Sequence, residues 1–464
     1  MAAKMGKQIS PPPDSVQKAW KYAAAHKADF VNSLKNLVSQ PSVSAQNIGL
    51  KECAEMVREQ MAELGFTVKL LKVERAPDIV YGTMQSVQPS AKTLVIYNHY
   101  DVQPAEPLDE WKSDPYKPVE RSGKLYGRGV GDDKGELVAR FNAIESLLNS
   151  GERPRSHLKW MVEGEEEVGS PHLHGFVEKN KPLLKGEGCL WEGGERTPSG
   201  RSEIHLGVKG LLYAEYHLKV GKKDQHSQYG AIAPNPAWRL VNLLKTLRNE
   251  KGKILIEGFY DDVIPPTLKE RQLIRANEFS AKELQKALEI DYLLEEKDDI
   301  ETVTKHLFSP TANIAGFGSG YQGKGAKTIV PKEAFAKMDF RLVAEMKAAD
   351  ILAKLKRHIR EKEFTDVELE VYGGEDPAKT SVESHIAQTM IRCSEMAEGE
   401  PPNVWPTIAG TGPMNLFTNL VGVPTAMGLG VNYAGASFHA PNEHIVLDYY
   451  HRGIRQLICL FAIF

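Results

Sequence analysis

Apolar segments that end in histidine or carboxylate side chains constrain this chain more than any other feature. Residues 94–98, 157–162 and 189–191 are apolar and in part β-branched, a composition typical of buried strands. A segment with helical periodicity, residues 136–148, lies between the first two of them. Strands that alternate with helices predict an α/β fold with a mainly parallel sheet.

Polar groups follow each of these predicted strands. His99 and Asp101 follow the first strand, residues 165–167 (all Glu) follow the second, and Glu192 follows the third. The carboxyl ends of parallel strands meet at one edge of a sheet, where α/β proteins bind their ligands. These side chains are therefore expected to gather in one site.

His99 and Asp101 are two residues apart, so an extended backbone places them on the same face. A carboxylate beside a histidine can accept one ring N–H and orient the other ring nitrogen toward a metal. A surface His–Asp pair that binds nothing is the alternative that this motif alone leaves open.

Two histidines and three carboxylates are the candidate metal ligands. Imidazole and carboxylate donors suit Zn²⁺, Co²⁺ or Mn²⁺. Two such ions, about 3.5–4 Å apart, need a bridging carboxylate and can activate a water molecule. A free carboxylate next to the ligands, here Glu166, can serve as a general base. A solvated acidic turn and a structural histidine are the alternatives for the separate motifs. The candidate ligands are His99, Asp132, Glu167, Glu192 and His439.

Length and composition limit the class of protein. A chain of 464 residues is too long for one ordinary core, which predicts two domains. The net charge of −3 argues against a nucleic-acid partner. The apolar run 457–464 is too short to span a membrane and is expected to be the buried end of the last helix. Four cysteines without paired spacing, and no secretory segment after Met1, predict reduced thiols and a cytoplasmic location.

The residue pattern changes near residue 207. Segment 328–342 has the composition of one long strand, and residues 261–305 are polar and charged, which predicts exposed helices. The strand–helix alternation returns near residue 385. The predicted division is a catalytic domain of residues 1–206 and 385–464 with an inserted α+β domain of residues 207–384.

Five motifs follow one another along the chain: His99-Tyr-Asp101, residues 127–135, residues 163–170, Glu192 and Phe438-His439. Their order resembles that of the M20 family of metallopeptidases. The resemblance covers the whole chain and is strongest to the branch of cytosolic nonspecific dipeptidases and carnosinase-like enzymes. It implies an α/β, di-metal-binding catalytic domain with a mainly parallel sheet, and an inserted α+β lid domain through which the protein forms a homodimer. It also implies two divalent ions per subunit, with Zn²⁺ expected and Mn²⁺ or Co²⁺ as alternatives, and a small peptide as substrate.

The resemblance implies a role for each candidate ligand. His99 and Glu192 would bind one ion, and Glu167 and His439 would bind the other. Asp132 would bridge the two ions, and the peptide bond that follows it would be cis.

The resemblance also implies roles for residues that do not bind metal. Asp101 would orient His99, and Glu166 would take a proton from the nucleophilic water. In the inserted domain, His226 would stabilise the oxyanion in the partner subunit's site, and Arg341 would hold the substrate carboxylate. Gly410-Thr411 matches a substrate-side loop.

One position departs from the dipeptidase branch, which usually has Asp where this chain has Glu192. Glu at this position is more typical of the deacylase, aminoacylase and carboxypeptidase branches. Both side chains can bind a metal, so the departure affects the substrate assignment. The expected activity is hydrolysis of dipeptides or short peptides, with a carboxypeptidase or an N-acyl-amino-acid deacylase as the alternative within the family. An inactive dimeric binding scaffold is the alternative from another class.

Overall fold

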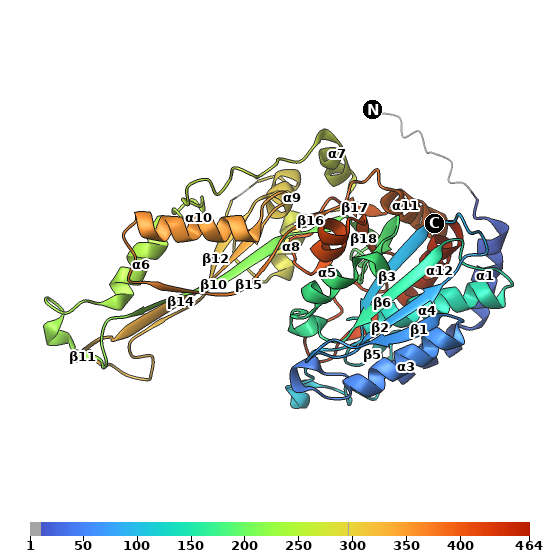
Figure 1. Cartoon of the computed structure of the whole chain (residues 1–464), viewed down its shortest axis with the longest axis horizontal. Helices are drawn as coiled ribbons and strands as arrows, with labels where there is room; N and C mark the ends of the chain where they lie inside the picture. Colours follow the sequence, from blue (N-terminus) through green and yellow to red (C-terminus); the bar gives the residue numbers. More distant parts are fainter. Residues whose placement is uncertain (1–10, 296) are drawn as a thin grey trace.

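The chain folds into two lobes that lie side by side (Figure 1). The computed structural model describes residues 11–295 and 297–464, so the first ten residues of the predicted catalytic domain lie outside it. The larger lobe is built on an eight-stranded sheet and the smaller lobe on a four-stranded sheet.

The large sheet is mainly parallel, as predicted. Of its seven neighbouring strand pairs, four are parallel (β6–β3, β3–β7, β7–β18 and β8–β17) and three are antiparallel. Its strands, in spatial order, are β1 (Thr67–Leu71), β2 (Ile79–Met84), β6 (His157–Glu163), β3 (Thr93–His99), β7 (Gly188–Leu190), β18 (Thr425–Gly428), β8 (Glu203–His205) and β17 (Asn403–Trp405).

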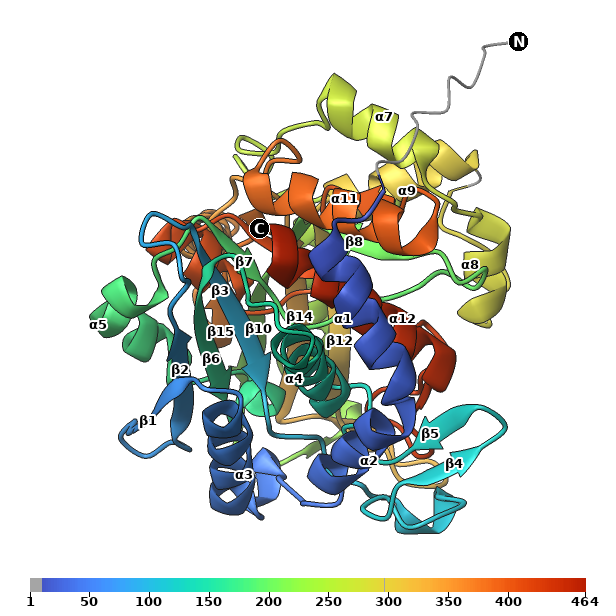
Figure 2. The ribbon, with the colours of Figure 1, turned by 90° about the vertical axis from the view of Figure 1, so that its right-hand side faces the viewer.

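Helices cover both faces of this sheet, which explains why β3 is apolar from Leu94 to Tyr97. Leu94 and Ile96 of β3 contribute to the core on one face, and Val95 and Tyr97 contribute to the core on the other. Figure 2 shows α1 to α4 together on the first face. Helix α5 (Leu173–Leu184) packs on the second face. The helices of the first face are α1 (Asp14–Ala25), α2 (Lys27–Val38), α3 (Leu50–Glu63), α4 (Lys134–Asn149), α11 (His385–Glu398) and α12 (Leu447–Ile463).

The C-terminal apolar run is the buried end of α12, as predicted, and Leu457, Ile458 and Phe461 are all inaccessible to solvent. Among the helices of residues 11–295 and 297–464, none has the length and apolar character needed to cross a bilayer. The cytoplasmic location inferred from the cysteines stays a prediction.

The smaller lobe contains an antiparallel sheet in which one face is buried. In β14 (Glu333–Leu342), every second residue from Ala334 to Leu342 is buried, which is the period expected of a strand with one dry face. Helices α6 (Pro236–Leu247) and α10 (Ala348–Glu361) contribute to the same core. The sheet order is β12 (Thr311–Ser319), β14, β10 (Gly210–Lys219) and β15 (Glu368–Glu375).

The prediction of one continuous strand over 328–342 is wrong. The segment forms two strands, because β13 (Ile329–Val330) ends just before Pro331 and pairs with β11 (Gln225–His226) outside the four-stranded sheet. Proline has no N–H to donate to a strand partner, so it favours a break at this point.

The prediction that residues 261–305 form only exposed helices is also wrong. Ile274, Val303 and Leu307 are buried together with Trp405 of β17, at the edge of the large sheet. Val303 and Leu307 are four residues apart and therefore lie on the same face of their helix. This part of the inserted sequence thus packs on the larger lobe. Its helices are α7 (Leu268–Ala276), α8 (Ala281–Ala287) and α9 (Asp299–Phe308).

Candidate metal centre and active site

The candidate ligands come from five separate segments that meet at the carboxyl ends of the strands of the large sheet. His99 is the last residue of β3, and Asp132 lies just before α4. Glu167 lies in a 3₁₀ turn (Glu166–Val168) that follows β6, and Glu192 comes two residues after β7. His439 lies in the loop before β19 (His444–Val446), and the Asp132–Asp133 peptide bond is cis.

The Asp132 carboxylate lies between the two histidines. Its Oδ1 atom is 3.0 Å from Nε2 of His99, and its Oδ2 atom is 3.1 Å from Nε2 of His439. Each carboxylate oxygen therefore faces a different imidazole. This is the arrangement expected of a carboxylate that bridges two metal ions.

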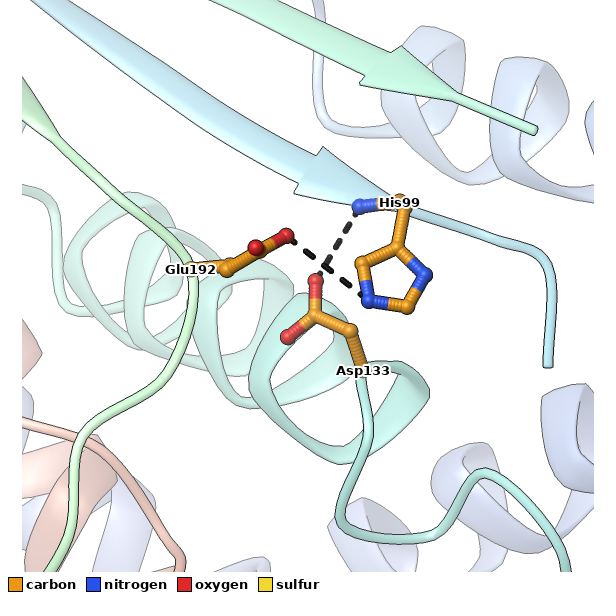
Figure 3. Close-up of side chains that lie close together, drawn as sticks. All are labelled: His99, Asp133 and Glu192. Atoms are coloured by element: carbon orange, nitrogen blue, oxygen red, sulfur yellow. Dashed lines mark hydrogen bonds and ion pairs between the residues drawn. The ribbon is translucent and has the colours of Figure 1, made fainter. Parts of the chain in front are cut away.

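The first group of potential ligands surrounds His99. Ligand atoms of His99, Asp133 and Glu192 lie within 4.8 Å of one another (Figure 3). Oδ2 of Asp133 accepts hydrogen bonds from the His99 backbone N–H at 3.1 Å and from the Asn98 amide at 2.6 Å. Oε2 of Glu192 is 3.7 Å from His99 Nε2 and, among the described residues, has no hydrogen-bond partner although it is buried. Of the two carboxylates in this group, Glu192 is therefore the one with an oxygen that remains free to bind a metal ion.

The second group contains Asp132, Glu167 and His439. Nε2 of His439 is 3.2 Å from Oε2 of Glu167. Gln103 holds the Glu167 carboxylate, because its backbone N–H donates to Oε1 at 3.2 Å and its side-chain amide donates to Oε2 at 2.9 Å. The His439 side chain is 54% exposed and the His99 side chain is 1% exposed, so the two groups differ in access to solvent.

Asp101 connects His99 to the glutamate-rich turn. Its Oδ1 atom is 3.3 Å from His99 Nδ1, which also lies 3.0 Å from the Asp101 carbonyl oxygen. The same carboxylate accepts the backbone N–H groups of Glu166 at 3.2 Å and of Glu167 at 3.1 Å. Asp101 is fully buried, so these contacts hold strand β3 and the turn in a fixed relation.

The Glu166 carboxylate is near the ligands but is not held by them. Among the described residues it forms no hydrogen bond and no ion pair. Burial raises the pKa of Glu166 to about 7, with further contributions from Asp132 and Glu167. A carboxylate with a pKa near neutrality is suited to accept and return a proton.

The charges of the site favour a bound cation. Burial alone would lower the pKa of His99, but hydrogen bonds to Asp101 and Asp132 raise it well above its usual value. Hydrogen bonds to Asp132 and Glu167 raise the pKa of His439 to about 10. Imidazole and carboxylate oxygen donors, together with the buried and unpartnered Glu192 oxygen, fit divalent metal ions such as Zn²⁺.

Glu443 is a buried carboxylate that sequence reasoning missed, and it holds the loop of Asp132. It accepts the backbone N–H groups of Gly129, Gly131 and Asp132 at 2.8, 2.8 and 3.1 Å. Arg128 donates to its Oε2 atom at 2.8 Å. Glu443 follows His439 by four residues, so it connects the loops that carry two of the proposed ligands.

Arg341, predicted to hold the substrate carboxylate, lies beside the predicted substrate-side loop of Gly410 and Thr411, at the junction of the two lobes. Nη1 of Arg341, on β14, donates to Oγ1 of Thr411 at 2.6 Å. Thr411 in turn donates to the carbonyl of Gly210 at 3.3 Å, and the Lys209 N–H donates to the carbonyl of Gly410 at 2.8 Å.

His226 does not lie with the other candidates. It belongs to β11, which is at the outer end of the smaller lobe, away from the large sheet (Figure 1). Its Nδ1 atom accepts the backbone N–H of Gln228, and the residue is exposed. Within one subunit, the structure therefore separates His226 from the metal ligands.

Sequence comparison places the chain in a known class of enzyme. Residues 95–462 match the model of the peptidase family M20/M25/M40. The chain belongs to this family, and it is a metal-dependent hydrolase of peptide bonds.

Two dipeptidases and a carboxypeptidase are among the proteins to which this chain is similar. The human Beta-Ala-His dipeptidase is 30% identical over 376 residues, which cover 76% of this chain and 73% of that protein. The Cys-Gly metallodipeptidase of Saccharomyces cerevisiae is 30% identical over 357 residues, which cover 72% of this chain and 73% of that protein. The solved structure of an M20 family metallo-carboxypeptidase from Sulfolobus solfataricus is 39% identical, with a TM-score of 0.87, and the match covers 94% of this chain and 99% of that one.

Proposed function

We propose that this protein is a two-metal peptidase that hydrolyses dipeptides or short peptides with a free C-terminal carboxylate. The observation that carries the proposal is the Asp132 carboxylate, whose two oxygens face two different histidines. The substrate class is supported by the two dipeptidases and the carboxypeptidase to which the chain is similar.

Each histidine would share one divalent ion with its own glutamate. His99 and Glu192 would hold one ion, His439 and Glu167 would hold the other, and Asp132 would bind both. Zn²⁺ is the expected ion because it favours nitrogen and carboxylate oxygen donors, with Mn²⁺ and Co²⁺ as alternatives. When bound, such ions lower the pKa of a water molecule and polarise the scissile carbonyl.

Glu166 would carry out the proton transfer, and Asp101 would hold the surrounding groups in position. Glu166 would take a proton from the attacking water and deliver it to the leaving amine, because it adjoins the ligand Glu167 and its carboxylate forms no hydrogen bond or ion pair among the described residues. Asp101 would orient His99, since its Oδ1 atom lies 3.3 Å from His99 Nδ1. It would also keep Glu166 in place, since it accepts the backbone N–H of that residue.

The smaller lobe would recognise the substrate. Arg341 and Thr411 would bind the free α-carboxylate, because a planar guanidinium can donate two parallel hydrogen bonds to it. Gly410 lies in the same loop as Thr411 and would line the substrate-binding site. His226 would act in the site of a partner subunit, and the lid of residues 207–384, inserted between residues 1–206 and 385–464, would form the homodimer.

Replacement of Arg341 by methionine is expected to raise KM, or to lower kcat/KM, for peptides with a free C-terminal carboxylate. The charge-assisted hydrogen bonds would be lost, a change worth about 1.5–3 kcal/mol, or roughly 10- to 150-fold. Peptides with a C-terminal amide should be much less affected. Kinetics on matched acid and amide substrates measure the preference ratio. Arg357→Met, on the exposed surface of α10, is the control, and an unchanged ratio in Arg341→Met would refute the role.

A carboxypeptidase is the second candidate, because the solved carboxypeptidase structure shares 39% of its sequence with this chain. Glu192 is consistent with this candidate and also with an N-acyl-amino-acid deacylase, because glutamate is typical of both the carboxypeptidase and the deacylase branches at this position. The three candidates share the metal site and differ only in what precedes the released amino acid.

Metal-dependent activity on a substrate panel tests the proposed function. Removal of divalent ions with a chelator should abolish hydrolysis, and about two equivalents of Zn²⁺, Mn²⁺ or Co²⁺ per subunit should restore it. The panel should contain dipeptides, tetrapeptides with a free C-terminus and N-acetyl amino acids. Preference for dipeptides would support the first candidate, and sequential release from tetrapeptides would support the second. Activity that survives complete metal removal would contradict the proposal.

A further inference from the structure

Arg140 is a charged residue in the most deeply buried helix of the larger lobe. It lies on α4 and is inaccessible to solvent. Its guanidinium forms no ion pair within 4.0 Å among the described residues, and it donates only to neutral oxygens. Nη1 donates to the Tyr97 carbonyl at 2.6 Å and to Oδ1 of Asn98 at 2.7 Å, and Nη2 donates to the Trp191 carbonyl at 2.5 Å.

The residues that carry these three oxygens precede two of the proposed metal ligands in the sequence. Tyr97 and Asn98 precede His99 on β3, and Trp191 precedes Glu192 after β7. One guanidinium therefore joins the ends of two neighbouring parallel strands at the residues where they reach the metal site. The planar guanidinium presents its N–H groups in a fixed geometry, so these contacts set the spacing of the two strand ends.

Asn98 extends the network to the backbone of His99. Its Oδ1 atom accepts hydrogen bonds from Arg140 and from Nε1 of Trp160, and its amide donates to Oδ2 of Asp133 at 2.6 Å. The same Asp133 oxygen accepts the backbone N–H of His99 (Figure 3). Every group in this chain of hydrogen bonds is buried, which makes the geometry stiff.

The other half of the metal site has a separate support. Gln103 donates to both oxygens of Glu167, and it forms no hydrogen bond with His99 or Glu192 within the described residues. Arg140 likewise forms none with Glu167 or His439. The two halves therefore share Asp132 but differ in the residues that hold their other ligands.

We propose that Arg140 is a positioning residue for the His99–Glu192 half of the metal site, and that Gln103 is its counterpart for the Glu167–His439 half. Loss of either residue weakens the binding of one ion and leaves the other in place. The inference rests on the proposed two-metal function. Replacement of groups that orient metal ligands typically lowers metal affinity about 10- to 100-fold.

Arg140→Lys is the decisive variant. Lysine keeps the positive charge but cannot supply the planar fork that reaches three oxygens on two strands. Zn²⁺ alone is the probe: ions bound per subunit are counted after dialysis against buffers of defined free Zn²⁺. The wild type should bind two ions, and Arg140→Lys should bind one with unchanged affinity and the other about 10- to 100-fold more weakly.

Reference variants identify the weakened half of the site. Co²⁺ replaces Zn²⁺, and the absorption spectrum of Arg140→Lys loaded with one ion is compared with those of His99→Ala and His439→Ala. It should match His99→Ala, in which only the Glu167–His439 half is intact. Gln103→Leu should give the opposite result and match His439→Ala.

The outcomes separate this inference from the proposed function. A wild type that binds fewer than two ions would contradict the two-metal function itself. A wild type with two ions, combined with unchanged binding or equal weakening of both ions in Arg140→Lys, would overturn only the present inference. If Arg140→Lys does not fold by circular dichroism, Asn98→Ala decides instead: selective weakening at the His99 half supports the proposal, and unchanged binding overturns it.

Discussion

Replacement of Glu166 by glutamine is expected to lower kcat about 10²- to 10⁴-fold, the usual loss when a general base is removed. Glutamine has nearly the same size but cannot accept the proton from water. Metal content should remain at the wild-type value, because Glu166 is not among the proposed ligands. Steady-state kinetics and metal analysis of the same preparation measure the two quantities.

The neighbouring Glu165 offers a matched control. Its carboxylate accepts the backbone N–H of His172 at 2.9 Å and lies 3.0 Å from Nδ1 of the same residue, so it is engaged outside the metal cluster. Glu165→Gln should therefore keep a kcat within a few-fold of the wild type. A Glu166→Gln variant that retains the wild-type kcat would remove Glu166 from the mechanism.

His226→Ala is expected to lower kcat about 10²- to 10³-fold, which corresponds to the loss of one donor to an oxyanion, about 2.7–4 kcal/mol. The expectation depends on a dimer, because β11 lies at the outer end of the smaller lobe of its own subunit (Figure 1). His217 is an exposed histidine on β10 of the same lobe, and His217→Ala should have little effect. Equal loss in both variants would point to damage of the lobe and not to oxyanion stabilisation.

Mixed dimers test whether His226 acts across the subunit interface. His226→Ala and Glu166→Gln homodimers should each be nearly inactive. After subunit exchange at equal concentrations, about half of the dimers are mixed, and each mixed dimer has one site with both residues intact, so about a quarter of the wild-type activity should return. Subunit exchange is verified by native mass spectrometry with one variant isotopically labelled. Verified exchange without recovery would exclude action in the partner's site.

Most of the larger lobe could be predicted because its elements have strong local signals. Strand β3 is apolar from Leu94 to Tyr97 since both of its faces are covered there, and α12 ends in an apolar run because it is buried there. The break at Pro331 also had a local signal, the missing N–H of proline, which the interpretation of 328–342 as one strand neglected.

The packing of α7 to α9 had only a weak local signal. Val303 and Leu307 form an apolar stripe, but a stripe does not specify its partner. That partner is Trp405, about one hundred residues later in the chain. Trp405 belongs to β17, which is the last strand at one edge of the large sheet. A contact between segments so far apart depends on the topology, which a residue pattern does not contain.

The sequence by itself determined the family, the α/β class and the chemical types of the candidate ligands, because the motifs are local and each has its own spacing. Tertiary structure decided which oxygen faces which imidazole: Asp132 lies between His99 and His439, which are 340 positions apart (439 − 99). It also decided what supports them. In the sequence, Arg140 is only a charged residue within a largely apolar helix. The folded structure brings the ends of β3 and β7 next to it, so that its guanidinium donates to three oxygens of Tyr97, Asn98 and Trp191.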